Sequence, residues 1–139
     1  MSSATAEFTV LVYSDDAAVR ERIRMAIGRR PAPDLGRVEC VEVATGDEVV
    51  AKADAGGLDL LILDAEAWPT GGLGLSRQLN NEIEPCPPIC VVLARNVDRW
   101  LATWSLADTY LSHPLDPIEA ATVVADVLRQ RASRLPAAR

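Results

Sequence analysis

Acidic residues close two largely apolar runs of this chain and point to chemistry at the ends of two strands. Asp64 ends the run Leu58–Asp64, and Asp15 and Asp16 follow the run Phe8–Tyr13 after a single serine. In open α/β sheets, ligands gather at the carboxyl edge of the strands, where such residues would meet. Carboxylates that meet there could bind a hard cation through their oxygens. One of them could also accept a phosphoryl group.

The length and composition indicate a globular chain with an acidic balance. The chain has 139 residues, of which 49% are hydrophobic, so it can bury one core. We expect a single domain over residues 1–139, with its core at about residues 8–131 and short tails at both ends. Lys and Arg total 14 against 20 Asp and Glu, and this formal net charge of -6 argues against a nucleic-acid partner. The arginines near the end of the chain suit the C-terminus of a helix instead; they are Arg129, Arg131, Arg134 and Arg139.

Three cysteines, Cys40, Cys86 and Cys90, lack the spacing of a metal site. Cys40 and Cys90 fall in apolar runs, so buried free thiols are expected there. Free thiols are typical of a reducing cytoplasm, which is where we expect the protein to reside. No run is apolar and long enough to predict a membrane span.

Apolar runs alternate with helical patterns along the chain. Strands are expected at residues 8–13, 38–43, 58–64, 89–93 and 110–112, with a helix after each. This alternation predicts an α/β fold in which helices cover both faces of a parallel sheet. Only a short tail follows the fifth helix, so no attached effector domain is expected.

Several helix ends carry recognisable signals. They are a stop at Gly28, a capping box at Thr45–Glu48, and N-caps at Asn96 and Asp116. The third helix is expected to be short, around Leu75 and Leu79. Three glycines interrupt its beginning, at Gly71, Gly72 and Gly74.

Three segments resemble the receiver domain of bacterial two-component response regulators. They are Val10–Arg20, with its acidic turn; Asp59–Asp64, with Pro69 and Gly72–Leu73 beyond it; and Ala107–Pro117. Their order and spacing match that family over essentially the whole chain. The resemblance implies a doubly wound, flavodoxin-like (βα)5 receiver fold, with a parallel five-stranded sheet in the order 2-1-3-4-5.

By that resemblance, Asp64 is the phosphoacceptor, and a histidine kinase or a small phosphodonor supplies the phosphoryl group. Asp15, Asp64 and the backbone carbonyl of Glu66 would hold Mg²⁺, whose charge offsets the repulsion between a carboxylate and a phosphoryl group. The implied function is that of a stand-alone response regulator in a two-component phosphorelay. Such a protein acts through protein contacts rather than as an enzyme.

Four positions depart from the family pattern. Ser14 replaces one of two acidic residues, a loss for which Asp16 could compensate as an accessory acid. Leu93 stands where the family has a Ser or Thr that senses the phosphoryl group, and leucine cannot donate a hydrogen bond. His113 stands in place of a lysine, and the charge of an imidazole depends on pH. Pro69 comes one residue late, so the loop over the acidic site is reshaped.

These departures leave two main hypotheses about function open. In the first, the chain is an atypical receiver that is phosphorylated slowly or by one dedicated kinase. In the second, it is a pseudo-receiver that serves as a protein-docking module or assembly subunit without phosphorylation. A hydrolase with paired aspartates lacks a cap domain here, and a flavin or nucleotide binder conflicts with the carboxylates after the first strand.

Aromatic residues map to the surface that contacts partners in the family, formed by the fourth helix, fifth strand and fifth helix. Trp100 and Trp104 lie four residues apart, on one side of the fourth helix, and Tyr110 lies in the fifth strand. If exposed, they would form an aromatic patch typical of interfaces; otherwise they belong to the core. The partner could be a target protein or a second copy of the chain. Tyr110 also matches an aromatic position that moves inward on activation in many receivers.

Overall fold

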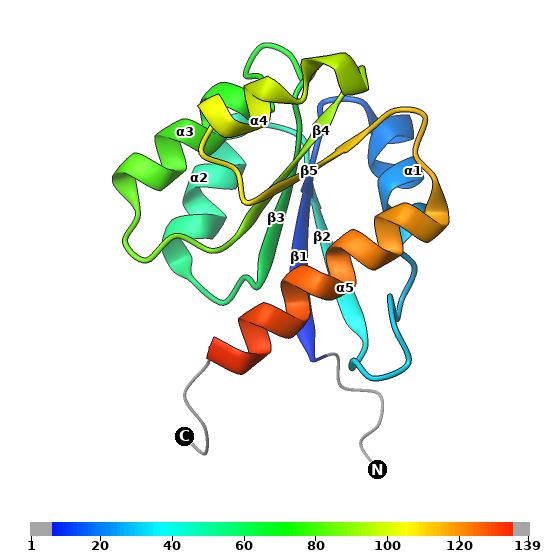
Figure 1. Cartoon of the computed structure of the whole chain (residues 1–139). Helices are drawn as coiled ribbons and strands as arrows, with labels where there is room; N and C mark the ends of the chain where they lie inside the picture. Colours follow the sequence, from blue (N-terminus) through cyan, green and yellow to red (C-terminus); the bar gives the residue numbers. More distant parts are fainter. Residues whose placement is uncertain (1–6, 135–139) are drawn as a thin grey trace.

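A computed structural model describes residues 7–134 and contains one parallel sheet of five strands (Figure 1). The strands lie in the order β2-β1-β3-β4-β5, which confirms the predicted topology. Their bounds are β1 Phe8–Tyr13, β2 Val38–Val43, β3 Leu60–Asp64, β4 Ile89–Leu93 and β5 Thr109–Ser112. Because β1 and β3 are neighbours, their carboxyl ends and the acidic residues there lie side by side.

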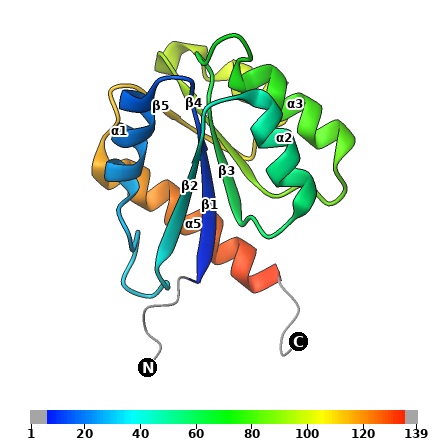
Figure 2. The same cartoon turned by 180° about the vertical axis from the view of Figure 1, so that it is seen from behind.

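Helices cover both faces of the sheet, as Figures 1 and 2 show from opposite sides. On one face, α1 (Ala17–Ile27) and α5 (Pro117–Arg134) pack against alternate residues of β1, β3 and β4. On the other, α2 (Gly46–Ala55), α3 (Gly72–Glu82) and the short α4 (Trp100–Trp104) pack against the remaining residues. Residues of β3 and β4 are therefore buried on both sides, which explains their continuous apolar sequences.

The expected caps of the first, second and fifth helices are present. Gly28 ends α1 with φ of 71°, a conformation that glycine adopts without strain, and its N–H donates to the Arg24 carbonyl at 3.0 Å. Thr45 and Glu48 form the capping box of α2. The Asp116 carboxylate accepts the N–H of Ile118 at 3.2 Å at the start of α5.

Two helix predictions were wrong. The third helix runs without interruption from Gly72 to Glu82, 11 residues, although glycines were expected to interrupt its beginning. The buried Gly72 lies against the backbone of β3, where a side chain would not fit. Asn96 does not cap the fourth helix; it is the first residue of a 3-10 turn, η1 (Asn96–Asp98), whose N-cap is Arg95. The α4 helix that follows is only 5 residues long.

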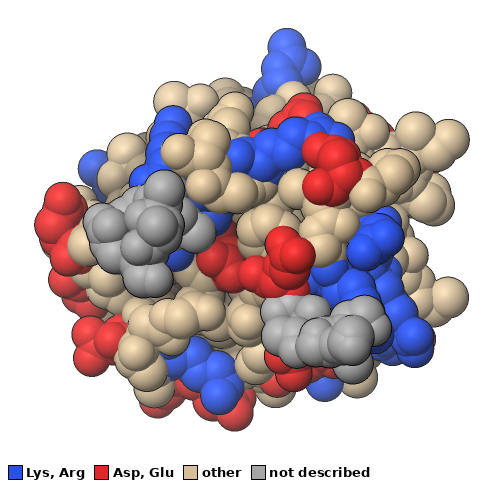
Figure 3. Space-filling view, turned by 90° about the horizontal axis from the view of Figure 1, so that it is seen from below, with Lys and Arg blue, Asp and Glu red and all other residues tan. Residues whose placement is uncertain are grey.

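Two of the arginines of α5, Arg129 and Arg131, form ion pairs. Arg129 donates to Asp34 at 2.8 and 2.9 Å, and this hydrogen bonding lowers the pKa of Asp34 to about 2. Arg131 pairs with Asp59 at 3.3 Å. Arg139 lies outside the described residues. Figure 3, seen from below the view of Figure 1, shows acidic and basic side chains interspersed on that face. Within residues 7–134, no helix is long and apolar enough to cross a membrane.

The thiols are expected to resist alkylation in the folded protein. Burial raises the pKa of Cys90 to about 12 and that of Cys40 to about 11, and it also raises the pKa of Cys86. Because the thiolate is the reactive form and burial disfavours it, Cys40 and Cys90 should react slowly at pH 8 while the protein is folded. Iodoacetamide labelling read by peptide mass spectrometry should modify the half-buried Cys86 first and Cys90 only after unfolding. Rapid labelling of folded Cys90 would contradict the described core.

Candidate functional site

Asp64 lies at the carboxyl end of β3 and is held in place by two hydrogen bonds. Only 4% of the residue is exposed. Its Oδ1 accepts the backbone N–H of Glu66 at 2.8 Å, and its Oδ2 accepts the Ser14 hydroxyl at 2.7 Å. Both carboxylate oxygens are therefore oriented by neighbours, which fixes the direction in which the group faces. Buried polar groups of this kind are stable only when they are paired in this way.

Ser14 connects the end of β1 to Asp64. It is completely buried, and besides donating to Asp64 its hydroxyl oxygen accepts the N–H of Asp16 at 3.0 Å. Its carbonyl accepts a hydrogen bond from Arg20 at 2.6 Å. The sequence predicted only that an acid was missing at position 14. The structure shows that the serine stabilises the Asp64 carboxylate, with a hydrogen bond in place of a second negative charge.

Asp15 is anchored to the loop that follows β3. Its Oδ1 accepts the backbone N–H of Trp68 at 3.0 Å, two residues beyond the amide that binds Asp64. The same loop is held from below by Tyr13, whose hydroxyl donates to the Thr70 carbonyl at 2.5 Å. Burial raises the pKa of Tyr13, and the charges of Asp15 and Asp64 add to this effect. The charges of Asp15 and Asp64 therefore both affect Tyr13, which shows that the two carboxylates lie near one another at this edge of the sheet.

Asp16, the expected accessory acid, caps α1 instead of facing Asp64. Its Oδ1 accepts the N–H of Ala18 at 2.9 Å, and its backbone is extended, as is usual for an N-cap. The Trp68 side chain, in the loop after β3, is 76% exposed. The loop therefore contacts the two carboxylates through backbone amides, while the Trp68 indole lies in solvent. The Trp68–Pro69 peptide bond within it is cis.

The donor set at this edge fits magnesium better than a transition metal. Asp15 and Asp64 offer carboxylate oxygens, and Glu66 follows on the same loop. Within residues 7–134, no group of three or more His, Cys, Asp or Glu side chains could hold a metal ion. Mg²⁺ does not need such a group, because it typically uses one or two carboxylates and keeps water or phosphate oxygens as its other ligands.

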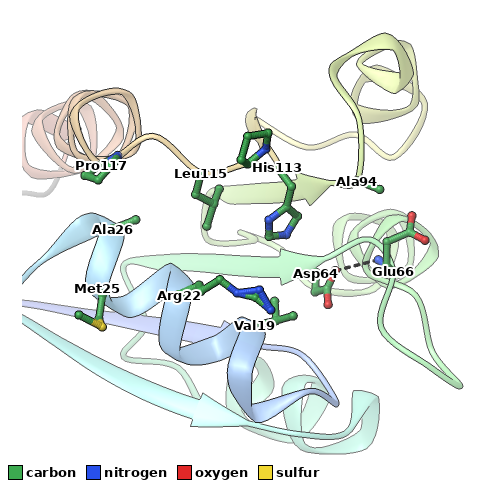
Figure 4. Close-up of a pocket in the computed structure, with 11 residues that line it drawn as sticks. Val19, Arg22, Met25, Ala26, Asp64, Glu66, Ala94, His113, Leu115 and Pro117 are labelled. Atoms are coloured by element: carbon green, nitrogen blue, oxygen red, sulfur yellow. Dashed lines mark hydrogen bonds between the residues drawn. The ribbon is translucent and has the colours of Figure 1, made fainter.

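Leu93 and His113 occupy different environments although they follow adjacent strands. Leu93 is 1% exposed and packs in the core beneath α3 and α4. The backbone N–H of His113 donates to the Leu93 carbonyl at 2.9 Å, and the His113–Pro114 peptide bond is cis. Figure 4 shows the His113 imidazole directed toward the space above Asp64. Of the two departures, only His113 can contact a group bound at Asp64 in this arrangement.

A cavity of about 880 Å³ opens above Asp64, between α1 and the turn that leads into α5. Its walls are mostly apolar, with Val19, Met25 and Leu115 among them, and its polar members are Asp64, Glu66, His113 and Arg22 (Figure 4). Sequence reasoning did not single out Arg22, because it belongs to no motif and lies within an ordinary helical pattern. The cavity makes Asp64 reachable from outside despite its burial.

The aromatic residues of the expected partner face do not form one patch. Trp100 is 65% exposed and Trp104 is 48% exposed, whereas Tyr110 is half-buried and packs on the core. The Trp104 ring lies 5.2 Å from the Arg77 guanidinium of α3, a cation–π contact, and its carbonyl accepts from Arg77 at 2.7 Å. Trp104 is therefore turned toward α3, and Trp100 is the more exposed of the two tryptophans.

Two relatives of this chain are named as regulatory proteins. An uncharacterized response regulatory protein of Mycobacterium tuberculosis is 47% identical over 129 residues, covering 93% of this chain and 97% of the relative. The transcriptional regulatory protein ResD of Bacillus subtilis is 30% identical over 128 residues, covering 91% of this chain and 50% of ResD. A comparison with protein-family models found no match.

Solved receiver structures share the fold. The receiver domain of the Francisella response regulator 1452 superposes with a TM-score of 0.75 at 17% identity, covering 89% of this chain and 98% of that domain. The response regulator TrrA of Thermotoga maritima, determined in complex with Mg²⁺ and BeF, has a TM-score of 0.70 at 24% identity, with coverage of 87% and 99%. At these identities the likeness concerns the fold.

Proposed function

Because this chain belongs to the receiver family of two-component response regulators, we propose that it accepts a phosphoryl group on Asp64 and signals through protein contacts. The observation that carries the proposal is the placement of the Asp64 carboxylate. It ends β3, is oriented by Ser14 and Glu66, and faces a cavity open to solvent. A buried carboxylate serving only the core would not need such an opening.

The chemistry is a phosphoryl transfer to a carboxylate. A carboxylate oxygen of Asp64 forms a bond to phosphorus while the bond from phosphorus to the donor breaks, and the donor leaves as free imidazole or carboxylate. The Glu66 amide and the Ser14 hydroxyl orient the Asp64 carboxylate for in-line attack. Mg²⁺, when bound to Asp15, Asp64 and the Glu66 carbonyl, would offset the repulsion between the Asp64 carboxylate and the phosphoryl oxygens.

The proposed donor is a histidine kinase or a small acyl phosphate, and the proposed setting is the cytoplasm, where such kinases present their phosphohistidine. The proposed output is contact with a target protein through α4, β5 and α5. The exposed Trp100 is the residue on that surface best suited to anchor a partner, because large exposed aromatic rings are enriched at interfaces. The complex of TrrA with Mg²⁺ and BeF supports the magnesium assignment by analogy with a protein of the same fold.

Phosphorylation is tested with acetyl phosphate and Mg²⁺. We expect intact mass spectrometry to show one added phosphoryl group on the wild type and none on Asp64→Asn. Asp16→Asn is the matched control, since its carboxylate caps α1 and does not face Asp64, so it should still form the adduct. Chelation of Mg²⁺ should slow the wild-type reaction strongly.

No adduct on the wild type over several hours, at both pH 6 and pH 8, would contradict the proposal. It would favour the alternative in which the fold serves as a docking module without phosphorylation. An adduct that persists in Asp64→Asn would place the phosphoryl group on another residue and would also contradict it.

A further inference from the structure

Arg22 of α1 projects into the cavity above Asp64. Figure 4 shows its guanidinium extending from α1 toward the carboxyl end of β3, with the His113 imidazole entering the same space from the other side. Within residues 7–134, the Arg22 guanidinium has no hydrogen bond or ion pair with a protein group. A permanent cation without a protein partner thus lines the cavity that holds the proposed phosphoacceptor.

The neighbouring arginines of α1 are engaged elsewhere. Arg20 pairs with Glu42 of β2 at 3.1 Å, and Arg24 pairs with the same carboxylate at 3.4 Å. Residues four apart share one side of a helix, whereas Arg22, two residues from each, lies on the opposite side. The geometry of α1 therefore directs two arginines to β2 and leaves the third facing the cavity.

The charges around the cavity show what Arg22 could bind. Asp64 and Glu66 are acidic, and a phosphoryl group on Asp64 would add further negative charge. The His113 imidazole enters the same space from the turn into α5, so Arg22 and His113 both line the cavity beside these acids. A guanidinium stays charged at any physiological pH, and its planar fork donates two parallel hydrogen bonds to phosphate oxygens.

We infer that Arg22 binds the phosphoryl oxygens on Asp64 and supplies a fixed positive charge to them from α1. The inference rests on the proposed phosphorylation of Asp64 and assigns a further binding residue to that site. The ligand class is a tetrahedral phosphoryl group or its beryllofluoride analogue. Because Arg22 itself is exposed, binding would hold its side chain against the cavity and partly close the opening.

The test compares Arg22→Gln and Arg22→Lys with Arg30→Gln. Arg30 is an exposed arginine just beyond α1, so its replacement changes the net charge equally but away from the cavity. Beryllofluoride affinity is measured by calorimetry with Mg²⁺, and the rate of phosphorylation is measured against acetyl phosphate concentration by mass spectrometry. Arg22→Gln should weaken beryllofluoride binding by about tenfold, as expected for loss of a charged hydrogen-bond donor. Arg22→Lys should recover part of that loss, because lysine keeps the charge but lacks the planar fork, and Arg30→Gln should match the wild type.

The outcomes separate this inference from the proposed function. If the wild type binds beryllofluoride and forms the adduct, but Arg22→Gln behaves as Arg30→Gln does, the role of Arg22 is overturned while the function stands. If the wild type neither binds beryllofluoride nor forms an adduct, both are overturned. Equal weakening in Arg22→Gln and Arg22→Lys would also overturn the inference, because lysine keeps the charge. Urea unfolding of each variant checks that the fold is intact.

Discussion

Replacing Gly72 with alanine is expected to lower the free energy of unfolding by about 1–3 kcal/mol, the usual cost of forcing an extra carbon into a packed region. A Cβ built on Gly72 would lie 2.6 Å from the Asp64 carbonyl oxygen and 2.8 Å from the Asp64 carbonyl carbon. Both are backbone atoms of β3, which cannot rotate away as a flexible side chain could. The start of α3 must therefore move, and it carries with it the end of the loop that holds Asp15 and Asp64.

Gly74 provides the matched control within the same helix. It is exposed, and a Cβ added there would meet no atom within 4 Å. Gly74→Ala should leave the protein unchanged or raise its free energy of unfolding by about 0.5–1 kcal/mol, because alanine favours the helix over glycine. Urea unfolding followed by circular dichroism measures both variants. Equal stability of the two variants would mean that α3 does not approach β3 as closely as described.

Replacing Ser14 with aspartate is expected to make the stability of the protein depend on magnesium. The Ser14 hydroxyl, completely buried, lies 2.7 Å from Asp64 Oδ2, so a carboxylate at position 14 would face a second carboxylate in a protected site. Two such charges about 4 Å apart repel by about 4 kcal/mol at an effective dielectric constant of 20. Unfolding in urea with a chelator should therefore occur at clearly lower denaturant concentration than for the wild type.

Added Mg²⁺ should recover much of that loss, because a ligand that binds only the folded state stabilises it by about 2.7 kcal/mol at 100 times its dissociation constant. Ser14→Asn is the matched control: it has nearly the size of aspartate but no charge, so Mg²⁺ should stabilise it no more than it stabilises the wild type. If Mg²⁺ stabilises Ser14→Asp no more than Ser14→Asn, a carboxylate at position 14 does not face the magnesium site.

The sheet could be predicted well from the sequence because its signals are local. Continuous apolar runs such as Ile89–Leu93 marked strands that are buried on both faces, and the capping box at Thr45–Glu48 fixed the start of α2. Family resemblance added the strand order, which local patterns do not contain. With that order, the proximity of Asp15 and Asp64 follows, since the ends of neighbouring parallel strands share one edge.

The errors occurred where contacts distant in sequence decide the structure. The glycines at the start of α3 suggested a broken helix, but Gly72 is required there by its contact with β3. Asn96 had the chemistry of a cap, yet the chain forms a 3-10 turn at that point. Neither outcome depends on the residue itself; each depends on what packs against it.

At the site, the sequence identified the carboxylates but not their hydrogen-bond partners. The role of the Ser14 hydroxyl can be recognised only from its distance to Asp64. The position of Asp16 in the sequence suited both metal binding and helix capping, and the structure shows that it caps α1. Arg22 was missed because its proposed role depends on the side of α1 on which it lies, which faces the cavity above Asp64. A helical pattern gives the spacing of a face, but not what lies opposite.

The hydrogen bond between the Trp68 amide and Asp15 has a consequence for how the protein can be observed. A metal ion that binds Asp15 Oδ1 competes with the Trp68 amide for the same oxygen, so metal binding there would disturb the loop that carries Trp68. The indole of the same residue stands in water and reports its surroundings through its emission. The chain thus carries a built-in optical probe at the mouth of its acidic pocket, with no dye required.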